Sequence, residues 1–193
     1  MRKLRGALCM PVFVALEISD PRLPLAAQPL TKYGYKVVDK DHLHLTLLFL
    51  GDHSGYHLHR ILETLRDVHL SLPSRLRVEG LTLLPPGKGT NVAILLRRDP
   101  LLYEARRELV ITLKGVVELR DRYEFLPHVT IARRLRPLDP ATEANTLKTM
   151  ERVRRLLPRT LAPTRLSVLR TVRGGGYERL MTLKASWVRR CTS

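Results

Sequence analysis

The sequence is poor in cysteine and has no long apolar run. Cys9 and Cys191 are its only cysteines in 193 residues, and they stand near opposite ends of the chain. Two thiols so placed form neither a disulfide framework nor the ligand spacing of a zinc site, and they suit the reducing cytoplasm. No stretch reaches the roughly 18 consecutive apolar residues of a membrane span, and no small-residue cleavage site of a secretory signal follows the first apolar run. We therefore expect a cytoplasmic protein that does not enter a membrane.

A phosphate-binding glycine loop and a set of metal ligands are also missing. The Gly-Lys-Gly run at 87–89 lacks the spacing of a Walker loop and the helix that follows one, so we expect no nucleotide cofactor. His53, His57, His59 and His69 lie close in sequence, but no acidic or cysteine side chain is placed to complete a metal shell with them. We therefore expect no metal site.

Acidic residues are scarce relative to basic ones. Asp and Glu number 18 against 34 Lys and Arg, which gives a formal net charge of +16 at pH 7. A surplus of this size favours a phosphate-rich partner, in the first place a nucleic acid. Arginine-rich surfaces also occur in heat-adapted proteins, so the charge alone does not identify the partner.

The pattern of apolar residues predicts alternating strands and helices. Residues 12–18 are apolar and β-branched and end at a Ser-Asp-Pro turn, which is typical of a strand. The same criteria predict further strands over residues 43–50, 76–84, 91–96, 127–133, 161–169 and 177–184. Helices are predicted over residues 54–69, 99–113 and 139–157, the last two opened by an Asp-Pro pair, with a short helix in the proline-interrupted segment 21–34. Strand and helix pairs recur in both halves, so we predict one α+β domain over residues 1–193 with antiparallel sheets.

Two short sequences put polar side chains on strands that are otherwise apolar. His44-Leu45-Thr46-Leu47 lies in one predicted strand and His128-Val129-Thr130-Ile131 in another, one in each half of the chain. In a strand, residues two apart point to the same face, so the His and Thr of each set share a face while the apolar residues enter the core. Chance alone gives roughly 0.5 His-x-Thr triplets in a chain of this composition, so the informative feature is the pair in two apolar strands.

Two such sets facing each other across a cleft can supply acid and base to one reaction. Imidazoles act as base and acid near neutral pH, and threonine hydroxyls donate hydrogen bonds to phosphate oxygens. One imidazole can deprotonate the attacking water while the other protonates the leaving oxygen, so the pattern favours in-line displacement at phosphorus. The alternative is that His44 and His128 are buried structural histidines, with the threonines chosen for strand propensity.

The segments HLHLTLLFLGD and PHVTIAR resemble the two signature motifs of the 2H phosphoesterase superfamily, in particular of the RNA 2′,3′-cyclic phosphodiesterases historically called 2′-5′ RNA ligases. VFVALEI resembles the family's opening strand and LSVLRTVRGGGYERLMTL its closing hairpin, so the resemblance runs nearly end to end. It implies a bilobal α+β fold, with two pseudo-symmetric lobes of antiparallel sheets flanked by helices around a central cleft. It also implies that a 2′,3′-cyclic phosphate at an RNA end is opened to a 2′-phosphate without metal or nucleotide cofactor, and that 2′-5′ ligation uses the same chemistry. The implied partner is a tRNA-like or short RNA with such an end, and we expect a monomer to bind it.

The resemblance implies roles for particular residues. His44 and His128 become the acid-base pair, and Thr46 and Thr130 become ligands of the phosphate oxygens. We take His128 as the base and His44 as the acid, a direction that the sequence does not decide. Arg133 matches the family's basic residue after the second motif and is a candidate phosphate ligand. Strict alternation from His128 would turn Arg133 away from the cleft unless the strand bulges there.

Other residues near the two motifs carry further expectations. This chain has Leu48 and Leu126 at two positions where relatives often have a basic residue. Strict alternation puts Leu48 on the cleft face, so we expect a less cationic cleft than is usual. Phe49 alternates to the core side, so Tyr177, beside the glycine run, is the candidate for base stacking, with hairpin packing as its alternative role. His42 shares the cleft face and is expected to be solvated at the start of its strand.

Two other functions stay open from the sequence. One is a phosphoesterase that acts on small cyclic nucleotides or 2′-5′ oligonucleotides, whose activity would not depend on RNA length. The other is a non-catalytic basic protein that binds RNA ends without turning them over.

Overall fold

The computed structural model describes residues 10–86, 88–119, 124–137, 139–173 and 176–189. The strands in these ranges are β1 Met10–Ile18, β2 Lys36–Val37, β3 His44–His53, β4 His69–Pro73, β5 Leu76–Leu84, β6 Asn91–Leu96, β7 His128–Arg133, β8 Thr160–Leu161, β9 Pro163–Thr171, β10 Tyr177–Thr182 and β11 Lys184–Val188. The α-helices are α1 Arg22–Ala27, α2 Gly55–Leu65, α3 Pro100–Thr112 and α4 Pro140–Leu156. Short 3-10 helices follow α1 and β2, at Gln28–Tyr33 and Lys40–His42.

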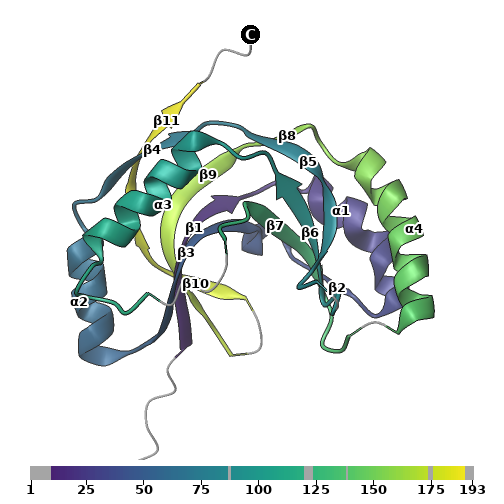
Figure 1. The fold of residues 1–193 in the computed structure, drawn as a ribbon, viewed down its shortest axis with the longest axis horizontal. Coiled ribbons are helices and arrows are strands. Elements are labelled where there is room, and N and C mark those ends of the chain that lie inside the picture. The colour runs from purple at the N-terminus through teal and green to yellow at the C-terminus, as the bar shows by residue number, and fades with distance from the viewer. Residues whose placement is uncertain (1–9, 87, 120–123, 138, 174–175, 190–193) are drawn as a thin grey trace, which may run out of the picture.

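Nine of these strands form one antiparallel sheet. Its order is β10-β9-β1-β3-β7-β6-β5-β8, with β2 paired to β7. In Figure 1 the sheet bends into an arch, with α2 and α3 at one end and α1 and α4 at the other. A second, parallel sheet consists of β4 and β11.

The nine-stranded sheet consists of two half-sheets that meet at β3 and β7. One half-sheet contains β10, β9, β1 and β3, and the other contains β7, β6, β5 and β8 together with β2. They are joined by a single residue pair, Leu45 opposite Val129, and both residues are fully buried. Leu45 and Val129 are the middle residues of the two His-x-Thr sequences, so a pseudo-two-fold axis passing between them relates one sequence to the other.

Some helices pack on the half-sheet other than the one that contains the preceding strand. α1 packs on β7 and α4 on β5, although α1 follows β1 of the other half-sheet, while α3 packs on β3 and β4. Each lobe is therefore built from segments that lie far apart in the sequence. A continuous apolar core runs through both lobes and includes Leu16, Ile61, Leu109 and Val153.

Most of the predicted elements are confirmed, as are the α+β class and the two lobes with antiparallel sheets. β5 and β6 have the predicted bounds, and Asp99 accepts a hydrogen bond from the Leu101 N–H as the cap of α3. The sequence patterns do not predict β4 or β11, whose parallel pairing links distant parts of the chain. None of the described helices is long and apolar enough to cross a membrane.

Replacing Asp99 by Ala removes the side-chain acceptor at the start of α3. The Leu101 N–H then loses its partner, which lies 3.0 Å away at Asp99 Oδ1, and the free energy of unfolding should fall by about 1 kcal/mol. Urea denaturation measures this loss, with Asp99→Asn, which keeps the acceptor, as the control. Equal destabilisation by both substitutions would contradict the capping role.

Candidate active site

Strands β3 and β7 share one irregularity just after their His-x-Thr sequences. The register of β3 with β1 skips Leu47, and the register of β7 with β6 skips Ile131. Each β-bulge adds one residue to its strand and reverses the alternation of side chains beyond it. The residue two positions past each bulge, Phe49 in β3 and Arg133 in β7, therefore shares the face of the histidine and threonine.

The two strand faces line one cavity of about 280 Å³. Six residues singled out from the sequence are in its lining: His44, Thr46, His128, Thr130, Arg133 and Tyr177. Four further residues complete the lining: Pro11, Phe13, Phe49 and Thr171. Because the antiparallel pair is centred on Leu45 and Val129, each histidine lies across from the threonine of the other lobe. The cavity thus receives an imidazole and a hydroxyl from each lobe.

The backbone holds both imidazoles in the same way. His44 Nδ1 donates a hydrogen bond to the carbonyl of His42 at 2.8 Å, and His128 Nδ1 donates to the carbonyl of Leu126 at 2.7 Å. A carbonyl oxygen only accepts, so the proton of each neutral ring is on Nδ1 and Nε2 is left for a ligand. Each Nε2 can take a proton as a base or, once protonated, give one as an acid.

His44 lies in the more enclosed environment of the two. Its ring centre is 5.2 Å from that of Phe13 and 4.6 Å from that of Tyr177. Burial lowers the pKa of His44 from 6.5 to about 4, and the positive charge of Arg133 acts in the same direction. His44 is therefore neutral in the free protein near pH 7. An acid role for His44 requires an anionic substrate phosphate to raise this pKa on binding.

Tyr177 connects the two lobes across the cavity. Its hydroxyl accepts a hydrogen bond from Arg133 Nη2 at 2.5 Å, and the Arg133 guanidinium lies 5.7 Å from the centre of the Tyr177 ring. The ring also makes edge contacts with His44 and Phe13. The β7 bulge thus brings Arg133 to the cavity, where strict alternation would not have put it.

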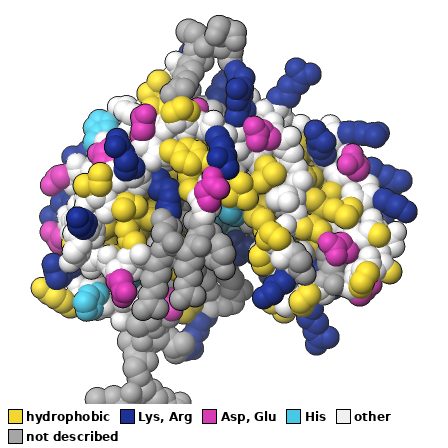
Figure 2. Space-filling view, viewed as in Figure 1, with side chains coloured by type: hydrophobic (Ala, Val, Ile, Leu, Met, Phe, Trp, Pro, Cys, Tyr) yellow, Lys and Arg dark blue, Asp and Glu magenta, His cyan; other side chains and the backbone are white. Residues whose placement is uncertain are grey.

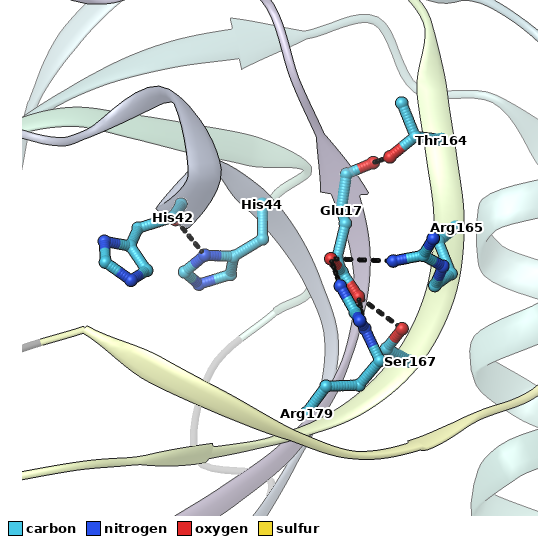
Figure 3. A network of polar contacts seen from close by, with 7 residues as sticks. All are labelled: Glu17, His42, His44, Thr164, Arg165, Ser167 and Arg179. Atoms are coloured by element: carbon cyan, nitrogen blue, oxygen red, sulfur yellow. Dashed lines mark hydrogen bonds and ion pairs between the residues drawn. The ribbon is translucent and has the colours of Figure 1, made fainter.

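A charged network anchors the strand that carries Tyr177. Glu17 of β1 accepts hydrogen bonds from Arg179 of β10, at 2.8 and 2.6 Å, and from Ser167 of β9 at 2.5 Å. Figure 3 shows this network beside His44, which is opposite Glu17 in the register of β1 and β3. The hydrogen bonds from Arg179 lower the pKa of Glu17, so its carboxylate is ionised near pH 7. Glu17 could not be singled out from the sequence, because its only signal there is a charge in the apolar strand β1.

The structure corrects several expectations about neighbouring residues. Leu48 belongs to the core and is only 2% exposed, while Phe49, expected in the core, is 57% exposed and lines the cavity. Both errors follow from the β3 bulge, which strict alternation does not include. His42 is half-buried rather than solvated, because its ring packs so closely on Gly176 that a Cβ there would lie 2.9 Å from Nε2. Leu126 is exposed but is not among the residues that line the cavity.

Basic side chains are spread over the surface. Figure 2 shows Lys and Arg around much of the visible face, with several on the side where Figure 1 has α4. That helix contributes Lys148, Arg152, Arg154 and Arg155. In the part of the chain that the structure describes, no group of three or more His, Cys, Asp or Glu is positioned to hold a metal ion.

Known proteins are similar to this chain in sequence and in fold. Residues 17–175 match the 2′-5′ RNA ligase superfamily. An RNA 2′,3′-cyclic phosphodiesterase of Archaeoglobus fulgidus is 32% identical over 130 residues, which cover 64% of this chain and 72% of that protein. The crystal structure of TT0787 of Thermus thermophilus matches with a TM-score of 0.61 and 24% identity, covering 90% of this chain and 97% of the other. LigT of Escherichia coli, solved in complex with 3′-AMP, matches with a TM-score of 0.64 and 15% identity, covering 92% and 99%.

The fold is that of a 2H phosphoesterase. Within that class, the chain belongs to the 2′-5′ RNA ligase superfamily. The resemblance carried by the two motifs is therefore confirmed over the greater part of the chain.

Arginine substitutions at Leu48 and Leu126 should differ strongly in their effect on folding stability. Leu48→Arg puts an unpaired charge in the core and should lower the free energy of unfolding by at least about 3 kcal/mol. Leu126→Arg, the matched control, changes a side chain that is 40% exposed and should alter it by less than about 0.5 kcal/mol. Chemical denaturation of both variants measures the difference. Equal stability of the two variants would mean that the β3 bulge is misplaced.

The depressed pKa of His44 predicts a pH-dependent stability. Between pH 6.5 and about 4, the unfolded chain binds a proton at His44 that the folded protein does not bind, so the stability due to this site falls as the pH falls. The loss should amount to about 2 kcal/mol after allowance for the partial exposure of the ring. Urea denaturation at pH 7 and pH 4 gives the loss of unfolding free energy for the wild type and for His44→Gln, which does not titrate at this position. The wild type should lose more, by this amount. Parallel pH dependence of the two proteins would show that His44 is not desolvated.

Proposed function

We propose that this protein is a metal-independent RNA 2′,3′-cyclic phosphodiesterase, which hydrolyses a terminal 2′,3′-cyclic phosphate to a 2′-phosphate. The observation that carries the proposal is the single cavity to which each lobe contributes one imidazole and one threonine hydroxyl. The name of the relative from Archaeoglobus fulgidus supports the reaction, and the net charge of +16 supports RNA as the substrate.

The proposed reaction is an in-line displacement at the cyclic phosphate. With His128 as the base, its Nε2 takes a proton from water, and the water oxygen forms a bond to phosphorus. The bond from phosphorus to the ribose O3′ breaks, and O3′ takes a proton from Nε2 of protonated His44. The products are a 2′-phosphate and a free 3′-hydroxyl. Each imidazole then contributes roughly 10²–10⁴-fold to the rate.

The remaining cavity residues stabilise the phosphate in this proposal. Thr46 and Thr130 donate hydrogen bonds to the non-bridging oxygens, and Arg133 supplies the positive charge that the developing anion requires. When Arg133 engages the phosphate, its bond to the Tyr177 hydroxyl competes with the new contact. The 5′-hydroxyl of a second RNA in place of water would give a 2′-5′ linkage, so we include reversible ligation in the proposal. We further propose that the enzyme acts as a monomer in the cytoplasm on tRNA-like or short RNA ends.

Turnover of a short RNA with a 2′,3′-cyclic phosphate end, measured in EDTA, tests the proposal. The wild type should form a 2′-phosphate, and His44→Ala and His128→Ala should each lower kcat by about 10²-fold or more. His59→Ala, which removes an exposed imidazole from α2, is the matched control and should leave kcat unchanged. Loss of wild-type activity in EDTA that added metal restores would refute metal independence.

The same assay, together with equilibrium binding of the RNA, separates the two alternative functions. A phosphoesterase for small cyclic nucleotides or 2′-5′ oligonucleotides would show no dependence of kcat/KM on RNA length. A protein that only binds RNA ends would show no turnover, and its affinity would change little in His44→Ala. Either result would overturn the RNA phosphodiesterase proposal.

A further inference from the structure

A cavity of about 580 Å³ is lined by arginines and shares no residue with the cavity that holds both histidines. Its lining includes Arg22 at the start of α1, Arg75 just before β5 and Arg159 just before β8, so three distant segments of the chain each contribute one arginine. The hydroxyl side chains of Ser19 and Thr160 also line it. This arginine cavity therefore presents positive charge together with hydrogen-bond donors.

The positive charge of the arginine cavity is only partly balanced. Its acidic residue is Asp20, which accepts hydrogen bonds from the Arg22 guanidinium at 2.9 and 2.6 Å and from the Arg22 N–H at 3.0 Å. The bonds from the guanidinium lower the pKa of Asp20, so its carboxylate is ionised near pH 7 and neutralises Arg22. Within the described ranges of the chain, Arg75 and Arg159 form no ion pair. Two guanidinium groups beyond the one held by Asp20 thus attract an anion to this surface.

Strands β1 and β9 connect the histidine-containing cavity with the arginine cavity. Phe13 of β1 and Thr171 of β9 line the first, while Ser19, just after β1, and Ala162, just before β9, line the second. The extended chain from Phe13 to Ser19 spans about 20 Å. Arg165 of β9 lies between the two cavities along this path, and its side chain is 43% exposed. An RNA strand that leaves the histidines along β1 and β9 can therefore bring one of its phosphates to the arginines.

We infer that the arginine cavity binds a backbone phosphate of the same RNA whose reacting end lies between His44 and His128. The inference rests on the proposed function and gives its substrate a second contact, several nucleotides from the cyclic phosphate. Guanidinium and hydroxyl groups are the usual protein partners of phosphate oxygens, and such contacts do not depend on base sequence. The contact should favour RNA ends that continue into a longer strand.

The length of the RNA tests the inference, because a dinucleotide is too short to reach the arginine cavity. One substrate is a dinucleotide and the other an RNA of about 12 nucleotides, both with a 2′,3′-cyclic phosphate end. Arg75→Gln combined with Arg159→Gln should raise KM for the longer RNA by about 5- to 20-fold, because charge-assisted hydrogen bonds to a phosphate are lost. KM for the dinucleotide should stay the same, which also shows that the double variant is folded.

The salt dependence of binding reports how many phosphates the protein contacts. For a single-stranded nucleic acid, the logarithm of the association constant falls with the logarithm of the salt concentration, with a slope of about −0.7 for each neutralised phosphate. In the double variant, the slope for the longer RNA should be smaller in magnitude by about 0.7, the value for one phosphate. A slope equal to that of the wild type would overturn the inference.

A matched control removes two positive charges elsewhere. Arg107→Gln combined with Lys114→Gln changes two exposed residues, in α3 and just after it, that lie outside the arginine cavity. This control should change KM for either substrate by less than about 2-fold, because salt screens charges that are distant from the RNA. Equal effects of the two double variants on the longer RNA, or equal rises in KM for both substrates in the arginine variant, would overturn the inference.

Equilibrium binding separates failure of this inference from failure of the proposed function. In a His44→Ala background without turnover, Arg75→Gln with Arg159→Gln should still weaken binding of the longer RNA and lower its salt slope. That result would support the second contact even if the wild type proved inactive on RNA ends. Saturable binding of inorganic phosphate that the arginine variant loses, with no change in RNA binding, would assign the cavity to a free anion and overturn the RNA contact.

Discussion

The pairing of Leu45 with Val129 joins the two half-sheets, and the cavity depends on it. These two residues are buried in the core, and the histidine and threonine on either side of each are turned to the opposite face. Antiparallel geometry about this pair brings a histidine from one lobe across from a threonine of the other. The symmetry of the four polar side chains is thus a consequence of strand register. A shift of register by one residue would turn each set away from the cavity.

The two bulges convert this symmetric scaffold into a chemically asymmetric cavity. They occur at the same place in both motifs and deliver Phe49 from one lobe and Arg133 from the other. The hairpin of β9 and β10 adds to the asymmetry, because its Tyr177 packs against the ring of His44. Glu17 holds that hairpin against β1 through Arg179. Burial lowers the pKa of His44, and both Tyr177 of this hairpin and Phe13 of β1 pack against its ring.

Much of the architecture could be predicted from local sequence patterns. The Asp-Pro pairs open α3 and α4, and the apolar runs define β1, β5, β6 and β7. The face shared by each histidine and threonine followed from the two-residue period of a strand. The bulges could not be predicted, because an extra residue in one strand is defined only by its partner strand, which lies elsewhere in the sequence. That is why Leu48 and Phe49 were assigned to the wrong faces.

Long-range features were missed for a related reason. The pairing of β4 with β11, the packing of α1 on β7 and the contact of Glu17 with Arg179 all join distant segments, and none has a local signature beyond a single charge in an apolar strand. The candidate site residues themselves could be selected from the sequence, because two copies of one short pattern occur in the chain. Repetition supplied the long-range information that a single motif lacks.

The pH dependence of single-turnover hydrolysis most directly tests the central claim that two imidazoles from the two lobes act as one acid-base pair. With enzyme in excess over a cyclic-phosphate RNA, the wild-type rate should follow a bell-shaped pH profile. One limb should disappear in His44→Ala and the other in His128→Ala. Which limb disappears in which variant would establish the direction of proton transfer. A wild-type profile without two limbs, or one that keeps both limbs in either variant, would contradict the claim.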